Sequence, residues 1–161
     1  MTKVYVFKTK IDHYGFLTKL AAEKYNIDAL SLKIGRNSHG KPYFESLHNF
    51  YFNVSHSDDL TVIAVSDQNI GIDAEKLRTP NLKVAKRFCE DEYAYINKNP
   101  SPTAFFEIWT KKEAYLKYTG EGLHGRLNSF SVFKTDIPIK TFKKGDYVIS
   151  VCGTKDFEII E

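Results

Sequence analysis

The sequence contains two short segments whose acidic and basic residues have the spacing of a site that handles phosphate. The first segment, residues 70–75, reads Ile-Gly-Ile-Asp-Ala-Glu. Its apolar, β-branched start predicts a strand that ends in two carboxylates, Asp73 and Glu75. Because side chains alternate along a strand, both carboxylates point to the same face.

The second segment, residues 109–117, reads Trp-Thr-Lys-Lys-Glu-Ala-Tyr-Leu-Lys and predicts a helix. Glu113 and Lys117 are four positions apart, so their side chains lie one above the other. If this helix packs on the first segment, a third carboxylate and an ammonium group join Asp73 and Glu75. The alternative is a solvated strand end and an exposed ion pair between Glu113 and Lys117.

Three carboxylates beside one ammonium group favour Mg²⁺ and phosphate chemistry. Mg²⁺ binds hard oxygen ligands, and proteins often hold it through carboxylates together with substrate phosphates and water. A lysine beside the metal is expected to bind a phosphate oxygen. We therefore predict a Mg²⁺ site formed by Asp73, Glu75 and Glu113, with Lys117 next to it.

Length and composition limit the classes of protein to which the chain could belong. Its 161 residues are most simply one domain, and 42% hydrophobic and 27% charged residues are ordinary for a soluble globular protein. No apolar run is long enough for a transmembrane helix, and the start lacks the apolar core of a secretion signal. The net charge of +3 does not indicate a nucleic-acid-binding protein.

The two cysteines, Cys89 and Cys152, have neither the spacing of a metal site nor the number of a disulfide framework. They favour a reduced compartment, so we expect a cytoplasmic protein. The histidines show no zinc-ligand spacing. The glycine-rich motifs of nucleoside triphosphate and dinucleotide folds are absent from the sequence.

Apolar periodicity and turn residues predict two groups of elements. In the first part we predict a helix over residues 13–25, a turn at 37–40, and strands or extended segments over 1–8, 30–34, 41–44, 50–54, 60–65 and 70–74. In the second part we predict helices over residues 77–98, with a break near 89–91, and 102–118, and strands over 130–133, 137–142, 147–151 and 157–160. This order predicts an α+β fold in which two halves, residues 1–75 and 76–161, pack as one unit.

The helix that carries Glu113 has clear local boundary signals. Ser101 is expected to cap its start, with Pro102 at the first helical position. Gly120 is expected to end it, because glycine readily adopts the left-handed conformation of a helix C-terminus. Both ends of this helix are therefore predicted from local sequence signals alone.

Four motifs, taken in order, resemble those of the 4′-phosphopantetheinyl transferase superfamily. They are Gly-Lys-Pro at residues 40–42, Asn-x-Ser-His-Ser at 53–57, Gly-Ile-Asp-x-Glu at 71–75 and Trp-Thr-x-Lys-Glu-Ala-x-x-Lys at 109–117. Further similar segments occur at residues 87–93, 120–123 and 129–132. The chain most resembles the longer, monomeric type that activates surfactin synthetase and other peptide synthetases, with a shortened N-terminal half.

The resemblance implies a fold and a reaction. The fold has two pseudo-symmetric α/β halves, and the protein is expected to be a monomer. The reaction transfers 4′-phosphopantetheine from coenzyme A to a serine of an apo acyl or peptidyl carrier protein and releases 3′,5′-ADP, in fatty-acid or secondary-metabolite biosynthesis. Substitution at a pyrophosphate needs charge neutralisation and positioning, which Mg²⁺ would supply. Neither nucleic acid nor a membrane is expected as a partner.

The resemblance also implies roles for residues outside the two acidic segments. Lys41, Ser55 and His56 are expected to bind the phosphates of coenzyme A, with Ser55 and His56 at the 3′-phosphate. Because adjacent strand residues face opposite ways, Ser55 and His56 make a poor nucleophile–base pair for a hydrolase. Lys117 is expected to bind a phosphate oxygen and to protonate the leaving phosphate.

The serine of the carrier protein needs a general base. Glu113, alone or through a metal-bound water, is the stronger candidate. Glu92 is the weaker candidate, because its carboxylate could instead stabilise the start of a helix. The expected catalytic residues are therefore Glu113 and Lys117.

Basic residues follow the predicted strand that carries Asp73 and Glu75, and they could bind an acidic partner. Lys83, Lys86 and Arg87 are three or four positions apart, so they would share one face of the predicted helix. Together with Lys111 they are expected to dock the carrier protein. The alternative is a solvated basic face without a partner.

Two functions of other classes stay open. A non-catalytic module could bind coenzyme A or a carrier protein, and the short N-terminal half motivates this hypothesis. A Mg²⁺-dependent nucleotide phosphohydrolase would keep the metal and need no carrier. The joint presence of Asp73, Glu75, Glu113 and Lys117 favours the transferase, because a binding module need not keep every metal ligand.

Overall fold

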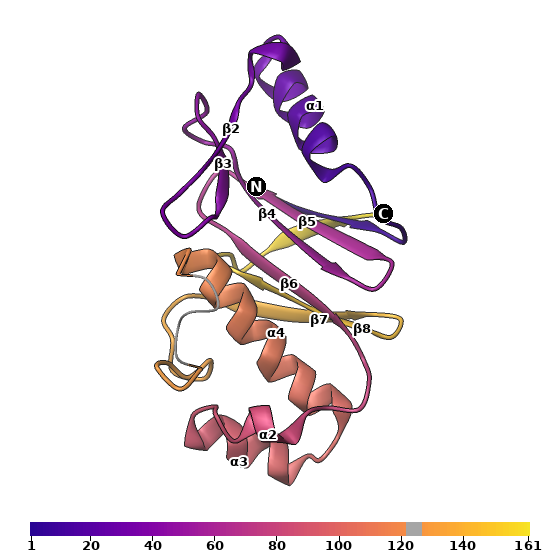
Figure 1. Cartoon of the computed structure of the whole chain (residues 1–161), viewed down its shortest axis with the longest axis vertical. Coiled ribbons are helices and arrows are strands. Elements are labelled where there is room, and N and C mark those ends of the chain that lie inside the picture. Colours follow the sequence, from indigo (N-terminus) through magenta and orange to yellow (C-terminus); the bar gives the residue numbers. More distant parts are fainter. Residues whose placement is uncertain (122–126) are drawn as a thin grey trace.

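The computed structural model describes residues 1–121 and 127–161 of the chain. It confirms the expected α+β class, since helices cover two packed sheets (Figure 1). None of the described helices is long and apolar enough to cross a membrane. Both cysteines, Cys89 and Cys152, are free.

The elements follow in this order along the chain. The first part contains β1 (Thr2–Phe7), α1 (His13–Tyr25), the 3-10 helix η1 (Ala29–Ser31), β2 (Ile34–Arg36), β3 (Pro42–Phe44), β4 (Tyr51–Ser57), β5 (Leu60–Ser66) and β6 (Gly71–Lys76). The second part contains α2 (Leu82–Ala85), α3 (Glu90–Lys98), α4 (Pro102–Thr119), β7 (Ile139–Lys144), β8 (Tyr147–Cys152) and β9 (Phe157–Ile160). The expected boundary between two halves near residue 75 falls inside β6.

The strands form a four-stranded sheet, a three-stranded sheet and a hairpin. The four-stranded sheet has the order β4-β5-β1-β9, the three-stranded sheet has the order β6-β8-β7, and β2 pairs with β3. β9 follows the three-stranded sheet in the chain but pairs with β1, in parallel. The chain thus passes from the four-stranded to the three-stranded sheet between β5 and β6, and it returns between β8 and β9.

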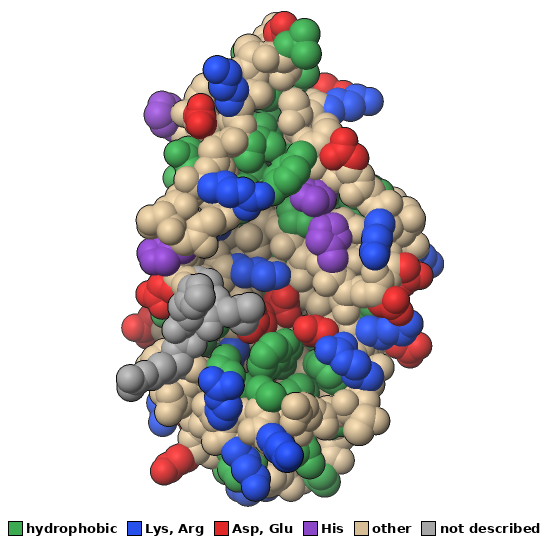
Figure 2. Space-filling model, viewed as in Figure 1, with side chains coloured by type: hydrophobic (Ala, Val, Ile, Leu, Met, Phe, Trp, Pro, Cys, Tyr) green, Lys and Arg blue, Asp and Glu red, His purple; other side chains and the backbone are tan. Residues whose placement is uncertain are grey.

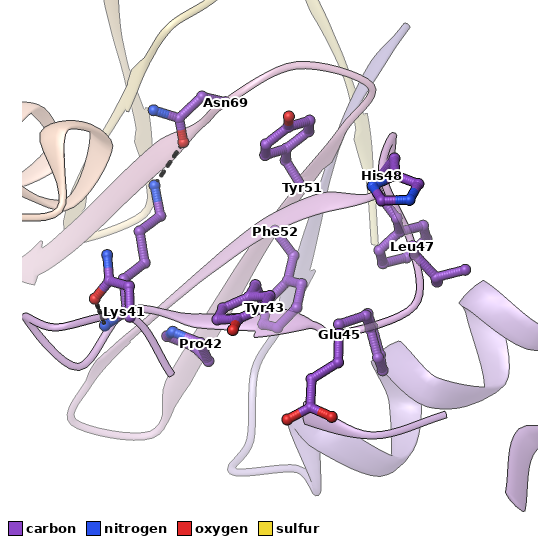
Figure 3. Close-up of a pocket in the computed structure, with 12 residues that line it drawn as sticks. Lys41, Pro42, Tyr43, Glu45, Leu47, His48, Tyr51, Phe52 and Asn69 are labelled. Carbon is purple, nitrogen blue, oxygen red and sulfur yellow. Dashed lines mark hydrogen bonds between the residues drawn. The ribbon is translucent and has the colours of Figure 1, made fainter. Parts of the chain in front are cut away.

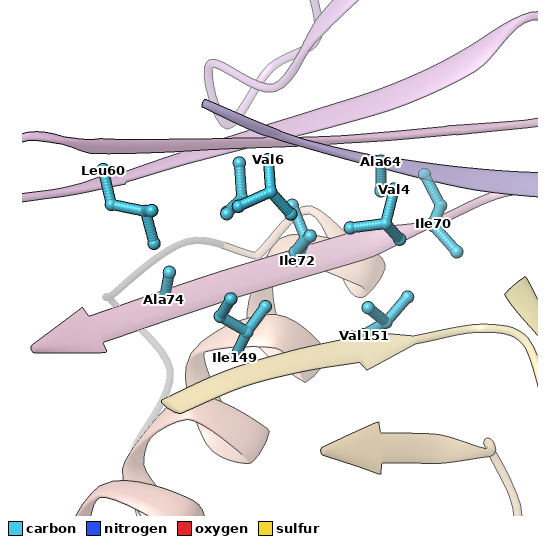
Figure 4. Close-up of a cluster of buried hydrophobic side chains, with 10 residues drawn as sticks. Val4, Val6, Leu60, Ala64, Ile70, Ile72, Ala74, Ile149 and Val151 are labelled. Atoms are coloured by element: carbon cyan, nitrogen blue, oxygen red, sulfur yellow. The ribbon is translucent and has the colours of Figure 1, made fainter. Parts of the chain in front are cut away.

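The core lies between the two sheets, as Figure 4 shows. The four-stranded sheet contributes Val4, Val6, Leu60, Val62 and Ala64, and the three-stranded sheet contributes Ile70, Ile72, Ala74, Ile149 and Val151. All of these side chains are buried, and burial of one such aliphatic side chain stabilises the fold by about 1.5–3 kcal/mol. On the outer face of the four-stranded sheet, α1 packs through Leu17 and Ala21.

The alternation of β6 determines which of its residues face α4. Ile72 and Ala74 point into the core between the sheets. Asp73 and Glu75 must therefore point to the other face, which α4 covers. One face of β6 stabilises the fold and the opposite face carries the charged residues.

The predicted boundaries of α4 are confirmed. Ser101 Oγ accepts a hydrogen bond from Ala104 N (3.2 Å), and Pro102 is the first helical residue. Gly120 ends the helix with a φ of 77°, a conformation that costs glycine little. The predicted helix over residues 13–25 is also confirmed, as α1.

Residues 30–34 do not form the predicted strand. The Asp28 carboxylate accepts a hydrogen bond from Leu30 N (3.0 Å) and starts η1, so the backbone turns instead of extending. The next strand, β2, begins only at Ile34.

The predicted break near residues 89–91 is confirmed, but the helix before it is much shorter than predicted. α2 has only four residues, and Cys89 precedes α3 as its cap residue. The backbone N–H of Cys89 donates to Glu92 Oε2 (3.0 Å), which starts the new helix. Lys83, Lys86 and Arg87 are all exposed. The expectation that they share one helical face is wrong, because α2 ends at Ala85.

Residues 130–133 are not a strand either. Phe130 O accepts a hydrogen bond from Lys112 Nζ (2.7 Å), and Val132 N donates to Glu92 Oε1 (2.8 Å). Side chains of α3 and α4 therefore bind the backbone groups that a neighbouring strand would otherwise bind.

Candidate active site

A glycine lets α4 pack closely on β6. A Cβ atom at Gly71 would lie 2.1 Å from the carbonyl oxygen of Ala114 and 2.6 Å from the backbone nitrogen of Tyr118. Only glycine fits this approach without moving the helix backbone. The close packing brings Glu113 and Lys117 of α4 over the carboxylates of β6.

Side chains of β4 hold the other edge of β6. They accept hydrogen bonds from every second backbone N–H of that strand. The contacts are Asn53 Oδ1 with Ile72 N (2.9 Å), Ser55 Oγ with Ala74 N (3.2 Å) and Ser57 Oγ with Lys76 N (2.9 Å). The Asn-x-Ser-His-Ser motif therefore fixes β6 from the side opposite to β8.

Most of the predicted site residues line one hollow of about 400 Å³ between β4, β6 and α4. The predicted residues in its wall are Ser55, His56, Asp73, Glu75, Glu113 and Lys117. Figure 2 shows acidic side chains in a depression on this face, with basic and histidine side chains beside them. The structure thus brings together six of the seven predicted site residues, and Lys41 is the exception.

Asp73 contacts neighbouring side chains through only one of its two carboxylate oxygens. Its Oδ1 accepts hydrogen bonds from Lys117 Nζ (2.8 Å) and Ser55 Oγ (3.0 Å). Its Oδ2 is buried and has no hydrogen-bond partner among the described residues. Burial raises the pKa of Asp73, and the Lys117 ammonium opposes this rise.

Glu113 is buried and, among the described residues, no donor contacts its Oε1. Burial and, to a smaller extent, the negative charge of Asp73 raise the pKa of Glu113 to about 7. A buried oxygen without a partner is costly unless a ligand completes it. Asp73 Oδ2 and Glu113 Oε1 thus fit a hard cation such as Mg²⁺.

The third carboxylate, Glu75, is already engaged by neighbouring side chains. Its Oε1 accepts a hydrogen bond from Trp109 Nε1 (3.1 Å), and its Oε2 is paired with Arg78 Nη1 (3.0 Å). Each of these oxygens keeps a second lone pair, so the contacts limit Glu75 as a metal ligand but do not prevent it. The fit to a cation is therefore strongest at Asp73 and Glu113.

His56 faces His13, which is not one of the predicted site residues. The ring of His56 lies 5.0 Å from that of His13, and its Nδ1 is 3.1 Å from Thr61 Oγ1. Burial lowers the pKa of His56, and the nearby His13 and Lys117 lower it further. His13 begins α1 and is distant from the motifs in sequence, and only the fold places its ring beside that of His56.

Lys41 does not line the hollow that holds the carboxylates. It borders a neighbouring hollow of about 190 Å³, whose wall also includes Lys117. Its ammonium group is 2.7 Å from Asn69 Oδ1, 3.0 Å from Ile70 O and 3.2 Å from Tyr118 O. The expected direct role at a coenzyme A phosphate has no support in this geometry.

Glu92 lies outside the hollow, and its carboxylate is part of a buried ion pair. Its Oε2 is 2.8 Å from Lys112 Nζ, and both side chains are fully buried. Its oxygens also accept hydrogen bonds from the backbone of Cys89 and Val132. These contacts exclude Glu92 as the base, and they make Lys112 a core residue and not part of a basic surface.

One group of possible metal ligands lies elsewhere. Cys89, Asp91 and Glu92 are the only three such residues in the described part of the chain whose ligand atoms all lie within 4.8 Å of one another. Glu92 is committed to Lys112, and Ser131 Oγ donates to Asp91 Oδ2 (2.8 Å). This group is therefore explained by internal contacts.

Comparison with known proteins covers nearly the whole chain. Residues 69–157 match the model of the 4′-phosphopantetheinyl transferase superfamily, and residues 12–68 match the model described as 4′-phosphopantetheinyl transferase, N-terminal. The first match alone covers more than half of the chain.

Three relatives have names of the same kind. The 4′-phosphopantetheinyl transferase gsp of Aneurinibacillus migulanus is 34% identical over 139 residues, which are 81% of this chain and 58% of the relative. A 4′-phosphopantetheinyl transferase of Bacillus subtilis is 39% identical over 116 residues, 70% of this chain and 52% of the relative. The 4′-phosphopantetheinyl transferase Sfp of Bacillus subtilis strain 168 is 35% identical over 115 residues, 69% of this chain and 51% of the relative.

The chain spans about half the length of these relatives. The matched region nevertheless includes every residue of the hollow between β4, β6 and α4. With both parts of its sequence matched and the charged motifs gathered at one site, the chain belongs to the 4′-phosphopantetheinyl transferase superfamily.

Proposed function

We propose that this chain transfers the 4′-phosphopantetheine group of coenzyme A to a serine of an apo acyl or peptidyl carrier protein and releases 3′,5′-ADP. The observation that carries the proposal is the pair of buried oxygens, Asp73 Oδ2 and Glu113 Oε1, which lack partners within the described residues and lie beside Lys117. Membership of the family supports the choice of substrate.

Asp73 and Glu113 would hold Mg²⁺, and Glu75 would join them through a remaining lone pair of its carboxylate. When bound, the cation would neutralise the pyrophosphate of coenzyme A and stabilise the charge that develops on the leaving phosphate. Without the cation, burial raises the pKa values of Asp73 and Glu113, and the charge of a neighbouring carboxylate raises each of them further.

Lys117 binds and orients the phosphate in this proposal. Its Nζ lies 2.8 Å from Asp73 and projects from α4 into the hollow. An ammonium group there can donate hydrogen bonds to a phosphate oxygen and a proton to the leaving 3′,5′-ADP. The proton is then replaced from solvent.

Glu113 is our candidate for the base that activates the serine of the carrier. Its buried carboxylate lines the hollow, where it would accept the proton of the serine hydroxyl. The serine hydroxyl loses this proton as its oxygen attacks the phosphorus of the pyrophosphate. Water is displaced from the hollow by the two substrates, which strengthens these charge interactions.

The nucleotide part of coenzyme A is proposed to lie along the other side of the site. His56 and His13 flank the carboxylate hollow, and the hollow of about 190 Å³ next to Lys117 could receive a base. Ser55 has its hydroxyl engaged by Asp73 and β6, so it supports β6 more than the nucleotide. We further propose a monomer that acts in the cytoplasm.

The function can be tested with purified protein, coenzyme A, Mg²⁺ and an apo carrier protein, followed by mass spectrometry of the carrier. A gain of one phosphopantetheine supports the proposal, and this gain should vanish with a chelator and in Glu113→Gln. Tight binding of coenzyme A without modification of the carrier would indicate a binding module. Loss of coenzyme A with an unchanged carrier would indicate a phosphohydrolase.

A further inference from the structure

The side chain of Lys41 connects three segments that are distant in sequence. Lys41 lies just before β3, and its ammonium group reaches the turn between β5 and β6 and the C-terminal end of α4. Figure 3 shows the side chain directed at Asn69. A lysine has three N–H donors, and Asn69 Oδ1, Ile70 O and Tyr118 O accept them at 2.7, 3.0 and 3.2 Å.

Asn69 completes this contact at the helix end. Its Nδ2 donates to Tyr118 O at 2.7 Å, while its Oδ1 accepts from Lys41 and from Ile70 N. Tyr118 O is one of the last carbonyl groups of α4, which have no partner inside the helix. A positive charge at this end also favours the helix dipole. We call Lys41, Asn69 and the Tyr118 carbonyl the helix-end clasp.

The helix-end clasp lies directly behind the residue that binds phosphate in the proposed reaction. Tyr118 follows Lys117 in the chain, and Lys41 and Lys117 both line the hollow of about 190 Å³. One wall of this hollow comes from the segment around Lys41 and the other from the last turn of α4. The clasp therefore fixes the distance between these walls.

We propose that Lys41 is a positioning residue, which acts through Asn69 and the Tyr118 carbonyl to hold Lys117 over β6, and that it is not a contact of the coenzyme A phosphates. This inference rests on the proposed transferase function. All acceptors of the ammonium group are neutral, and burial lowers the pKa of Lys41 to about 8. A lysine that is saturated by protein acceptors has no donor left for a phosphate.

The test compares Lys41→Met, Asn69→Ala and the double variant, with Lys33→Met as control because Lys33 is exposed in the same part of the chain. Because a displacement of about 1 Å at a catalytic group can cost a hundredfold in rate, we expect each single variant to lower kcat by roughly ten- to a hundredfold. The double variant should be no worse than the worse single variant, since both break one clasp. The control variant Lys33→Met should have the same kcat as the wild-type protein.

Binding measurements separate positioning from a direct contact with the 3′-phosphate, which is the group that dephospho-coenzyme A lacks. A positioning role predicts that Lys41→Met weakens coenzyme A and dephospho-coenzyme A by the same factor. Selective loss of coenzyme A binding, or losses of kcat that multiply in the double variant, would overturn the proposal. Asn69→Ala keeps the Lys41 charge, so an unchanged kcat in this variant would overturn it even if Lys41→Met did not fold.

A separate readout distinguishes failure of the clasp from failure of the transferase function. If the wild-type protein modifies no carrier, the proposed function fails, and thermal unfolding then tests the clasp alone. The decreases in Tm of the two single variants should not add in the double variant. Additive decreases would show that Lys41 and Asn69 act independently.

Discussion

Lys117 of α4 and Asp73 of β6 form an ion pair of 2.8 Å that occupies only one oxygen of the carboxylate. The other oxygen, Asp73 Oδ2, has no hydrogen-bond partner among the described residues, and neither has Glu113 Oε1 on the same helix as Lys117. One ammonium group thus faces two buried carboxylates. The metal-free site has an excess of negative charge, which a cation would remove.

The first prediction concerns binding of the metal. Mg²⁺ should raise the Tm of the wild-type protein, because a ligand that binds only the folded state stabilises it. Asp73→Asn and Glu113→Gln should lose this rise and the transfer activity, while they keep the fold. Thermal unfolding with and without Mg²⁺ measures the effect, and Glu23→Gln on the exposed face of α1 is the control. Normal turnover by Glu113→Gln would contradict both its metal and its base role.

The second prediction concerns the pH dependence of stability without metal. The pKa of Glu113 is about 7 in the folded protein against an ordinary value of 4.5. Between these values the folded state holds a proton that the unfolded chain has lost, so the contribution of Glu113 to stability is fully present below pH 4.5 and is lost as pH rises through about 7. A shift of this size corresponds to at most about 3 kcal/mol.

Urea unfolding of the metal-free protein on both sides of this window measures the loss. Glu113→Gln should be more stable than the wild type above the window and should show a flatter profile. Mg²⁺ should restore the stability of the wild type at high pH. If stability depends on pH in the same way in the wild type and in Glu113→Gln, the pKa of Glu113 is not raised in the folded protein, and the prediction is wrong.

The third prediction concerns recognition of the nucleotide. His56→Ala and His13→Ala should weaken coenzyme A more than dephospho-coenzyme A, because the two rings face each other beside the site. A lost hydrogen bond to a charged group costs about 1.5–3 kcal/mol, or roughly ten- to a hundredfold in affinity. Calorimetric titration with both ligands measures the difference, and His48→Ala, an exposed histidine outside this hollow, is the control. Equal losses for both ligands would remove the histidines from the phosphate site.

The fourth prediction concerns the buried ion pair. Lys112→Met should destabilise the protein by about 3–5 kcal/mol, because it leaves the Glu92 carboxylate buried without its partner charge. Adding Glu92→Gln should recover part of this loss. Chemical denaturation of the two single variants and the double variant measures the coupling. Additive effects would show that the pair contributes little beyond its separate contacts.

Local sequence signals predicted the part of the site that depends on periodicity. The alternation of β6 places Asp73 and Glu75 on one face, and the four-residue spacing in α4 aligns Glu113 with Lys117. These relations hold within one strand or one helix, so they follow from the sequence without knowledge of the fold.

Relations between distant segments could not be predicted in this way. Lys112 is next to Glu113 and resembles a surface lysine, and its burial depends on Glu92, which is twenty positions away in another helix. Lys41 belongs to a motif of the family, yet only the fold shows that its donors are all bound. The apolar residues 130–133 have the pattern of a strand, but side chains of Lys112 and Glu92 bind their backbone.

The last prediction concerns docking of the carrier. Lys83, Lys86 and Arg87 are exposed at and just after α2, although the short helix gives them no common face. Their neighbours in the chain, Asn81 and Val84, line a hollow of about 220 Å³ that also has aromatic side chains in its wall. Glu75 and Trp109 of the active site line the same hollow. An acidic carrier could therefore approach this basic surface while its serine reaches the carboxylates.

Attraction between exposed charges acts mainly on the rate of encounter and is screened by salt. Lys83→Glu with Lys86→Glu should thus raise the KM for the carrier and flatten its salt dependence, while the KM for coenzyme A stays the same. Lys19→Glu with Lys155→Glu changes the net charge equally at exposed sites elsewhere and is the matched control. If both double variants raise the carrier KM alike, the effect comes from net charge, and these residues form no docking surface.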